Sequence, residues 1–136
     1  MDVGVVILSH GASGIDMLRA VETMLGKPLS GWEAVEAIFG ETREALSHRL
    51  TAAIDRNDTG AGVIVATDLY GATPSRCAQE IAHHHTASPV VVLCGLSMPM
   101  LMKLASTPRD TTPAELAKIA AETARRSVLL IDEGQS

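Results

Sequence analysis

The stretch VGVVILSHG, residues 3–11, decides the fold. Residues 3–8 are apolar at every position, which is typical of a strand covered on both faces in a parallel sheet. Residues 62–66 show the same pattern, and residues 89–93 open with a proline and continue Val-Val-Val-Leu. The sequence therefore predicts three strands of a parallel sheet, with helices on both of its faces.

Segments with helical spacing of apolar residues lie between these strands. The stripes are Leu18, Val21 and Leu25; Leu46, Leu50 and Ala53; and Cys77, Ala78, Ile81 and Ala82. Residues 32–39 lie between Gly31 and Gly40, which favours a further strand over a turn of helix. This alternation of strand and helix predicts an α/β fold, a flavodoxin-like doubly wound sheet with strand order 2-1-3-4.

The C-terminal part of the chain carries a clear helix start. Residues 112–115, Thr-Pro-Ala-Glu, combine a capping box with proline at the first helical position, and the helix should run to about Arg126. Residues 127–131 are apolar and short enough for a last strand, and residues 132–136 are expected to form a frayed tail. We thus expect one domain over residues 1–131.

Composition narrows the class of protein. A chain of 136 residues fits one domain, and with 46% hydrophobic but only 2% aromatic residues its core must be aliphatic. A net charge of -5 without a basic run argues against nucleic acid as a partner. With no basic leader and no stretch of about 20 apolar residues, we expect no membrane insertion and a cytoplasmic location. Cys77 and Cys94 are expected to be buried, reduced thiols.

Ligands of such sheets bind at the carboxyl ends of the strands, where successive crossovers go to opposite faces. Here His10 follows the first strand and Asp68 follows the third, so the topology should bring them together. A histidine or aspartate in such a loop is often merely solvated, but their convergence favours chemistry. Asp68 could hold one ring nitrogen protonated and leave the other free as a nucleophile, which suits a phosphoryl carrier.

Two predicted helix starts could supply N–H groups to phosphoryl oxygens. One lies within residues 11–14, where Gly11 lets the backbone approach a ligand closely. The other lies at Thr73 and Pro74, where Thr73 is predicted to be the N-cap and Pro74 the first helical residue. On residue preference alone, Thr73 is more often a plain cap than a ligand.

The other histidines point to no metal site. His83, His84 and His85 are consecutive, so on a helix they face different directions and suit a C-terminal turn better than a shared ion. His48 lies among polar residues and is predicted to be on the surface. We expect neither a metal nor a cofactor.

Three motifs together resemble a known family. They are Ser9-His10-Gly11, the run from Asp68 to Pro74 (DLYGATP), and residues 95–101 (GLSMPML). In this order they are similar to the mannose-type enzyme IIA domain of the bacterial phosphoenolpyruvate-dependent sugar phosphotransferase system. The resemblance covers nearly the whole chain, including Leu25-Gly26 at the end of the first helix. Ala72 and Ser97 depart from the family's glycine and asparagine, which affects loop detail.

The resemblance implies a specific relay. His10 would receive phosphate on Nε2 from a histidine-containing phosphocarrier protein and pass it to a IIB-type protein, for sugar uptake or for regulation. Asp68 would orient His10. The residues expected at the phosphate are Gly11, Thr73, Gly71 and Tyr70. Family members are homodimers that exchange a C-terminal strand, which would give residues 127–131 a role.

Other proteins also use a turn of this kind. A histidine phosphatase or mutase has a His-Gly after its first strand but wants an arginine where Ser9 stands. A small metal chelatase would need a second liganding histidine at a strand end. A flavodoxin-like regulatory module is disfavoured because few aromatic residues are present to hold a flavin. No IIB domain follows Ser136 in this sequence, so we expect the acceptor to be a separate protein.

Overall fold

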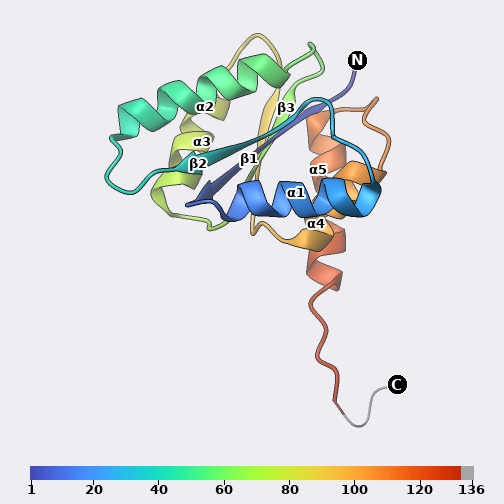
Figure 1. The fold of residues 1–136 in the computed structure, drawn as a ribbon. Coiled ribbons are helices and arrows are strands. Elements are labelled where there is room, and N and C mark those ends of the chain that lie inside the picture. Colours follow the sequence, from blue (N-terminus) through green and yellow to red (C-terminus); the bar gives the residue numbers. More distant parts are fainter. Residues whose placement is uncertain (133–136) are drawn as a thin grey trace.

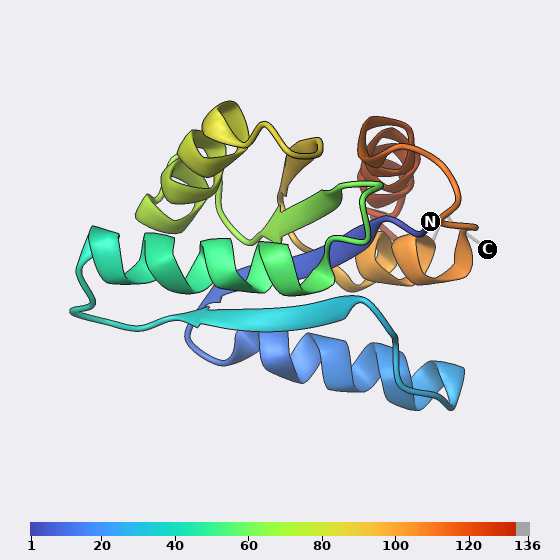
Figure 2. The same ribbon diagram turned by 90° about the horizontal axis from the view of Figure 1, so that it is seen from above.

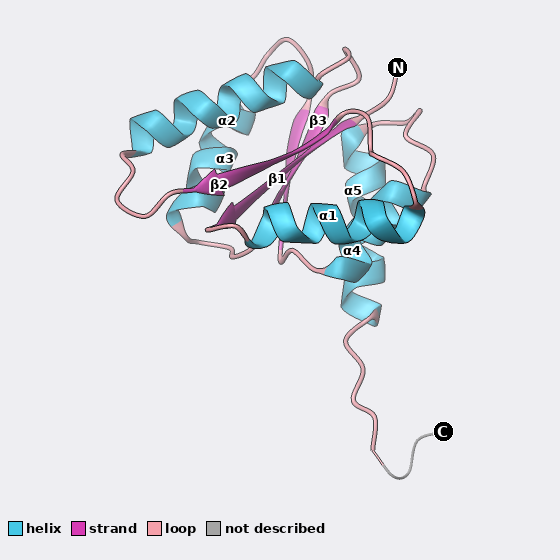
Figure 3. Cartoon of the chain, in the orientation of Figure 1, coloured by secondary structure: helices cyan, strands magenta, loops and turns pink. Residues whose placement is uncertain are grey.

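The computed structural model describes residues 1–132, in which strands and helices alternate up to the fourth strand (Figures 1 and 3). The strands are β1 (Gly4–His10), β2 (Trp32–Ala37), β3 (Val63–Thr67) and β4 (Val90–Cys94). The helices are α1 (Ser13–Leu25), α2 (Arg43–Asn57), α3 (Thr73–His84), α4 (Met98–Ser106) and α5 (Pro113–Arg126).

The four strands form one parallel sheet in the order β2-β1-β3-β4. Helices α2 and α3 pack on one face, and α1, α4 and α5 pack on the other, as the view from above shows (Figure 2). The predicted α/β class and strand order 2-1-3-4 are confirmed. The sheet thus brings the carboxyl ends of β1 and β3 next to each other.

Strand β1 lies in the middle of an aliphatic core. Its side chains alternate between the faces: Val5 and Ile7 pack with α1, α4 and α5, whereas Val6 and Leu8 pack with α2 and α3. All four are fully buried. Burial of each such side chain stabilises the fold by about 1.5–3 kcal/mol. Because both faces of β1 are covered, its apolar run has no polar alternation.

The helix ends follow the local signals in the sequence. Thr112 caps α5, since its Oγ1 accepts a hydrogen bond from the Glu115 N–H at 3.2 Å. Gly26 ends α1 with a φ of 72°, a left-handed conformation that glycine adopts without strain. Helix α3 ends in His83 and His84, as predicted, with His85 as its C-cap. The predicted starts of α1 and α5 are confirmed.

Several boundaries differ from the prediction. Strand β2 ends at Ala37, so Ile38 and Phe39 belong to the following loop. The last strand predicted over residues 127–131 is wrong for the single chain. Among the described residues these follow α5 without a strand partner, and their apolar side chains are exposed. Of the tail predicted over 132–136, residues 133–136 lie outside the described residues.

Two further features were not anticipated. Helix α4 begins after its N-cap Ser97, whose Oγ accepts a hydrogen bond from the Met100 N–H. The helix is too short for its apolar residues to show a clear helical periodicity in the sequence. Cys77 is buried as predicted, but Cys94 is only half-buried because β4 is an edge strand. Both cysteines are free thiols.

Over residues 1–132 no helix is both long and apolar enough to cross a membrane.

Candidate active site

His10 is the last residue of β1, at the carboxyl edge of the sheet. Its strand lies between β2 and β3, and it pairs in register with Ala37 of β2. The next residue, Gly11, turns the chain with a φ of 61° and donates its N–H to the Ala37 carbonyl at 3.4 Å. The imidazole therefore lies at the carboxyl edge of the sheet, where the helices that follow β1 and β3 pack on opposite faces.

Asp68 meets His10 from the end of β3. Its carboxylate accepts a hydrogen bond from the His10 backbone N–H at 2.8 Å. The same carboxylate lies 3.1 Å (Oδ1) and 2.9 Å (Oδ2) from the ring Nδ1. Because an ionised carboxylate only accepts hydrogen bonds, Nδ1 carries the proton. The contact predicted from topology is present, and it fixes both the tautomer and the orientation of the ring.

The second ring nitrogen is free to react. The His10 side chain is 54% exposed, and no residue in the described part of the chain is hydrogen-bonded to Nε2. With the proton on Nδ1, Nε2 keeps its lone pair, on a side chain that is about half exposed. The arrangement supplies an oriented nitrogen nucleophile beside a carboxylate that stabilises positive charge on the ring.

The environment of Asp68 shifts its pKa. Partial burial alone raises the pKa of the Asp68 carboxyl, but the hydrogen bonds from the backbone and ring of His10 and the charge of that ring outweigh burial. The net result is a pKa below that of an ordinary aspartate. Asp68 therefore stays ionised at neutral pH, as an acceptor for Nδ1 must.

This shift predicts how stability depends on pH. Because the pKa of Asp68 is lower in the folded chain than in the unfolded one, at about 3.9, Asp68 stabilises the fold above that pH. The contribution is lost as the pH falls through the folded-state pKa. We expect the free energy of unfolding to fall more steeply below about pH 5 in the wild type than in Asp68→Asn. Urea unfolding at several pH values measures this, and parallel curves for the two proteins would contradict it.

Ser9 supports the loop that follows His10, a role that the sequence motif contains but does not reveal. Its side chain is fully buried, and its Oγ accepts a hydrogen bond from the Gly14 N–H at 2.8 Å. It also donates to the Gly11 carbonyl at 3.3 Å. The N-cap of α1, Ala12, has no side-chain oxygen. Ser9, which lies outside the helix, therefore supplies the hydrogen-bond acceptor for a backbone N–H of the first turn. A Cβ on Gly14 would lie 2.7 Å from this Oγ, so only glycine fits there.

Ser75 supports the other loop in a similar way. Its buried hydroxyl accepts a hydrogen bond from the Gly71 N–H at 2.9 Å and donates to the Ala72 carbonyl at 2.9 Å. The N–H of Gly71 is therefore engaged within the loop, at a turn where the φ of this glycine is 86°. Ser75 was missed in the sequence because a serine after Thr-Pro reads as an ordinary first-turn residue.

Thr73 and Tyr70 lie in the same loop region. The prediction that Thr73 caps α3 is wrong: Ala72 is the N-cap, Thr73 is the first helical residue and Pro74 the second. Because the backbone enters the helix one residue earlier, the Thr73 side chain makes no capping bond. Tyr70 is 73% exposed. The structure thus brings His10 and Asp68 into direct contact, whereas the phosphate-binding roles of Gly11, Thr73, Gly71 and Tyr70 stay predictions.

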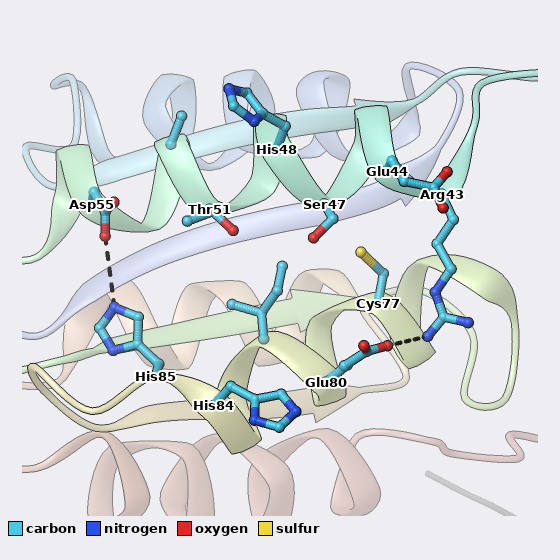
Figure 4. A pocket seen from close by; sticks show the side chains of 12 residues that line it. Arg43, Glu44, Ser47, His48, Thr51, Asp55, Cys77, Glu80, His84 and His85 are labelled. Atoms are coloured by element: carbon cyan, nitrogen blue, oxygen red, sulfur yellow. Dashed lines mark hydrogen bonds and ion pairs between the residues drawn. The ribbon is translucent and has the colours of Figure 1, made fainter.

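A hollow in the surface lies away from His10. It measures about 920 Å³ and runs between α2 and α3 (Figure 4). The ion pairs Arg43–Glu80 and His85–Asp55 span it at its two ends. Neither His10 nor Asp68 lines it, so His10 stands on an open edge and not in this hollow. Among residues 1–132, no three His, Cys, Asp or Glu side chains are arranged to hold a metal ion.

The fold and the site together define a class of protein. It is a doubly wound α/β protein with an oriented, exposed histidine at the carboxyl edge of its sheet. Comparison with known proteins identifies the family. Residues 4–121 match the family model EIIA-man, described as the PTS system fructose IIA component. The chain therefore belongs to this family of phosphotransferase system (PTS) components, which confirms the resemblance.

Relatives in this family are moderately similar. The chain is 31% identical to the PTS system mannose-specific EIIAB component of Escherichia coli K12 over 134 residues, covering 94% of this chain and 39% of that protein. It thus spans about two-fifths of that relative. It is 30% identical to the putative phosphotransferase enzyme IIA component YadI of the same strain, covering 82% of this chain and 75% of that one.

Solved structures confirm the fold. The phosphotransferase system component EIIA from Streptococcus agalactiae superposes with a TM-score of 0.84 at 20% identity, covering 94% of this chain and 96% of that one. The mannose/sorbose-specific IIA subunit from Enterococcus faecalis superposes with a TM-score of 0.83 at 22% identity, covering 97% and 96%. At sequence identities of 20% and 22%, this structural similarity is evidence about the fold alone.

Proposed function

We propose that this chain relays phosphoryl groups through Nε2 of His10, in the cytoplasm. A histidine-containing phosphocarrier protein is the donor, and a IIB-type protein is the acceptor. The observation that carries the proposal is the contact between Asp68 and Nδ1, which leaves Nε2 unprotonated on a half-exposed side chain. Membership of a family of phosphotransferase system components supports it.

The transfer balances without a cofactor. The Nε2 lone pair of His10 attacks the phosphorus of the donor's phosphohistidine, the donor's P–N bond breaks, and its electron pair returns to the donor's ring nitrogen. Nδ1 keeps its proton throughout, and the Asp68 carboxylate stabilises the positive ring of phosphorylated His10. The negative charge of Asp68 also disfavours a permanent phosphate. The group can therefore leave again by the same route to the acceptor.

Groups around His10 suit the transferred phosphate. The first turns of α1 and α3 both start near this edge of the sheet, and their N–H groups favour negative charge. The hydroxyl of Thr73, which is not engaged in capping, is a further donor. We assign Gly11 and Gly71 to the tight turns that bring these groups close, and Tyr70 to the exposed rim.

A IIB-type acceptor fits one relative in particular. The name of the mannose-specific EIIAB component joins an A and a B part in one protein, and this chain matches about two-fifths of it. The match over residues 4–121 argues against the phosphatase and chelatase alternatives. Which sugar, if any, the relay serves depends on the proteins downstream of His10.

Labelled phosphoenolpyruvate tests the relay directly. With the general phosphocarrier proteins added, the chain should acquire label that is stable in alkali and lost in acid, as expected for phosphohistidine. A IIB-type protein should then remove the label. Label that survives acid, or no label at all, would refute the proposal.

We further propose that two copies of the chain pair through their C-terminal segments. Two observations support this pairing. In the described part of the chain, strand β4 is an edge strand with one unpaired side, and the apolar side chains beyond α5 are exposed, namely Val128, Leu129, Leu130 and Ile131. An unpaired edge invites a further strand, and the segment of a second copy would bury both surfaces.

Removal of the segment tests the pairing. Sedimentation equilibrium should give a dimer for the full chain and a monomer for a chain that ends at Ser127, because the truncated chain lacks the strand that covers β4. A chain that ends at Ile131 is the matched control and should remain dimeric. A monomeric full chain, or a dimeric chain ending at Ser127, would contradict the pairing.

A further inference from the structure

The sheet has two edge strands, β2 and β4, and their outer sides are occupied differently. Among residues 1–132, the strand order β2-β1-β3-β4 leaves each of the two with one side that no strand covers. An uncovered edge presents backbone N–H and C=O groups with which a strand of a second copy can pair. Both edges are therefore open to the same kind of association unless other groups occupy them.

The pairing with β1 shows which backbone groups of β2 face outward. The Gly31 carbonyl accepts a hydrogen bond from the Val5 N–H of β1 at 2.9 Å, so this carbonyl faces β1. The register between the two strands is unbroken along β2. Because the N–H and C=O groups of successive strand residues point alternately to the two sides, those of Trp32, Ala34 and Glu36 point away from β1.

There is room for another chain beside β2. The strand lies between α2 on one face of the sheet and α1 on the other (Figure 2). A hollow of about 490 Å³ lies along it, lined by residues 33–36 and by side chains of both helices. A strand could therefore enter here unless the outward hydrogen-bonding groups are already engaged.

Two side chains engage the outer side of β2 at its carboxyl end. Arg49 of α2 donates a hydrogen bond from Nη2 to the Glu36 carbonyl at 2.6 Å. Glu41 accepts the N–H of Ile38 on Oε1 at 3.2 Å. Arg49 and Glu41 are joined to each other by two hydrogen bonds, each at 2.7 Å, and are called the Arg49–Glu41 pair.

This pair copies the hydrogen bonds of one residue of a strand. In a parallel ladder, a residue donates to the carbonyl before the position that it faces and accepts from the N–H after that position. Val5, which faces Trp32 and donates to the Gly31 carbonyl, is an example within this sheet. The Arg49–Glu41 pair donates to the residue before Ala37 and accepts from the residue after it. It thus takes the place of a residue of a further strand.

The pair is not easily displaced. The Glu41 side chain is only 11% exposed, and that of Arg49 is 38% exposed. The hydrogen bonds from Arg49 lower the pKa of the Glu41 carboxyl and outweigh the opposite effect of burial, so the carboxylate stays charged at neutral pH. Hydrogen bonds between a guanidinium and a carboxylate are among the strong ones. A strand that enters beside β2 must first break them.

Strand β4 has no comparable cover. In the described part of the chain, no side-chain hydrogen bond reaches the backbone of Val90–Cys94. The Thr67 hydroxyl donates to the Cys94 Sγ at 3.3 Å, a contact that leaves the backbone of β4 unengaged. The two edges of the sheet therefore differ in their readiness to accept a strand.

We propose that the Arg49–Glu41 pair closes the β2 edge against the strands of a second copy, and so leaves β4 as the edge along which copies can pair. The closure of β2 rests on contacts within one chain. It holds whether or not copies pair along β4, and the tests below keep the two proposals apart.

Removal of both side chains should open the β2 edge. The double variant Arg49→Ser/Glu41→Ser keeps the net charge and adds no apolar surface. At the same concentration of full-length protein, we expect sedimentation equilibrium to give an average mass about twofold or more above that of the wild type, because the freed edge accepts another copy. An average mass equal to that of the wild type, in a variant with the wild-type circular dichroism spectrum, would overturn the inference.

Arg56→Ser/Glu33→Ser is the matched control. This ion pair also joins α2 to β2, with Arg56 Nε donating to Glu33 Oε1 at 3.1 Å, but it bonds to the side chain of β2 and not to its backbone. The control should keep the wild-type mass. Equal association of both double variants would mean that the loss of any such ion pair causes it, and the closure would be refuted.

Hydrogen exchange of the wild type needs no variant that folds. The amides of Ala34 and Glu36 point away from β1, so they should exchange quickly at every protein concentration, whereas the Ile38 amide, bonded to Glu41, should exchange more slowly. Protection of Ala34 and Glu36 that grows with concentration would show a strand paired with β2 and would overturn the inference. A monomeric wild type with a dimeric Arg49→Ser/Glu41→Ser variant would refute the pairing along β4 and support the closure of β2.

Discussion

We expect the His10→Ala protein to take up no phosphoryl group from phosphoenolpyruvate and the phosphocarrier proteins. The relay has one nucleophile, the Nε2 of His10, and alanine offers no atom that could form a P–N bond. The side chain is half exposed at the end of β1, so its loss leaves the aliphatic core untouched. Gel electrophoresis of protein labelled from radioactive phosphoenolpyruvate measures the loss.

His48→Ala provides the matched control for this loss. His48 is an exposed histidine on α2. It should be labelled at the wild-type rate, and circular dichroism should show the same fold in both variants. Equal labelling of His10→Ala and wild type would show that phosphate is carried by another residue and would end the proposal.

The second large effect concerns Asp68. Asp68→Asn should fold but transfer phosphate about 10²-fold more slowly. This is the usual size of the rate effect when a positioned acid-base group is removed. The amide can no longer stabilise a positive ring, and it can hold Nδ1 in the unprotonated form by donating to it. Then Nε2 would carry the proton and lose its lone pair. Rapid-quench measurement of the transfer from phosphorylated carrier gives the rate.

A positioning role has a signature that a purely structural role lacks. Nitrogen chemical shifts of the His10 ring should report the proton on Nδ1 in the wild type and a change of tautomer in Asp68→Asn. The matched control is Asp110→Asn, an exposed aspartate in the loop before α5, which should leave both the rate and the tautomer unchanged. Wild-type transfer by Asp68→Asn would remove Asp68 from the mechanism.

Much of the fold follows from local sequence patterns. The apolar runs of β1 and β3 need cover on both faces, and that need alone requires a parallel sheet with helices on both sides. Gly26 and Thr112 mark helix ends through backbone conformation and side-chain capping, both of which are local effects. These predictions were correct because each rests on residues that are neighbours in the chain.

The errors have a common physical origin. The N-cap of α3 is Ala72 and not the predicted Thr73, and Ser75 in the first turn is hydrogen-bonded back to the loop before the helix. Residues 127–131 have the composition of a strand, but a strand also needs a partner, and among residues 1–132 no strand pairs with them. Cys94 is half-buried because its strand is at an edge. Each outcome depends on which segments meet, a fact that short windows of sequence do not contain.

The sequence alone determined the α/β class, the strand order and the candidacy of His10 and Asp68, because strand periodicity and the rules of chain crossover are local or topological. Only the tertiary structure decided which nitrogen of His10 is held and which is free, since that depends on distances between residues 58 positions apart. It also decided that the buried hydroxyl of Ser9 supports the loop after His10 by accepting a hydrogen bond from the Gly14 N–H. Such contacts form when distant segments pack together, and the orientation of the reactive group is set by them.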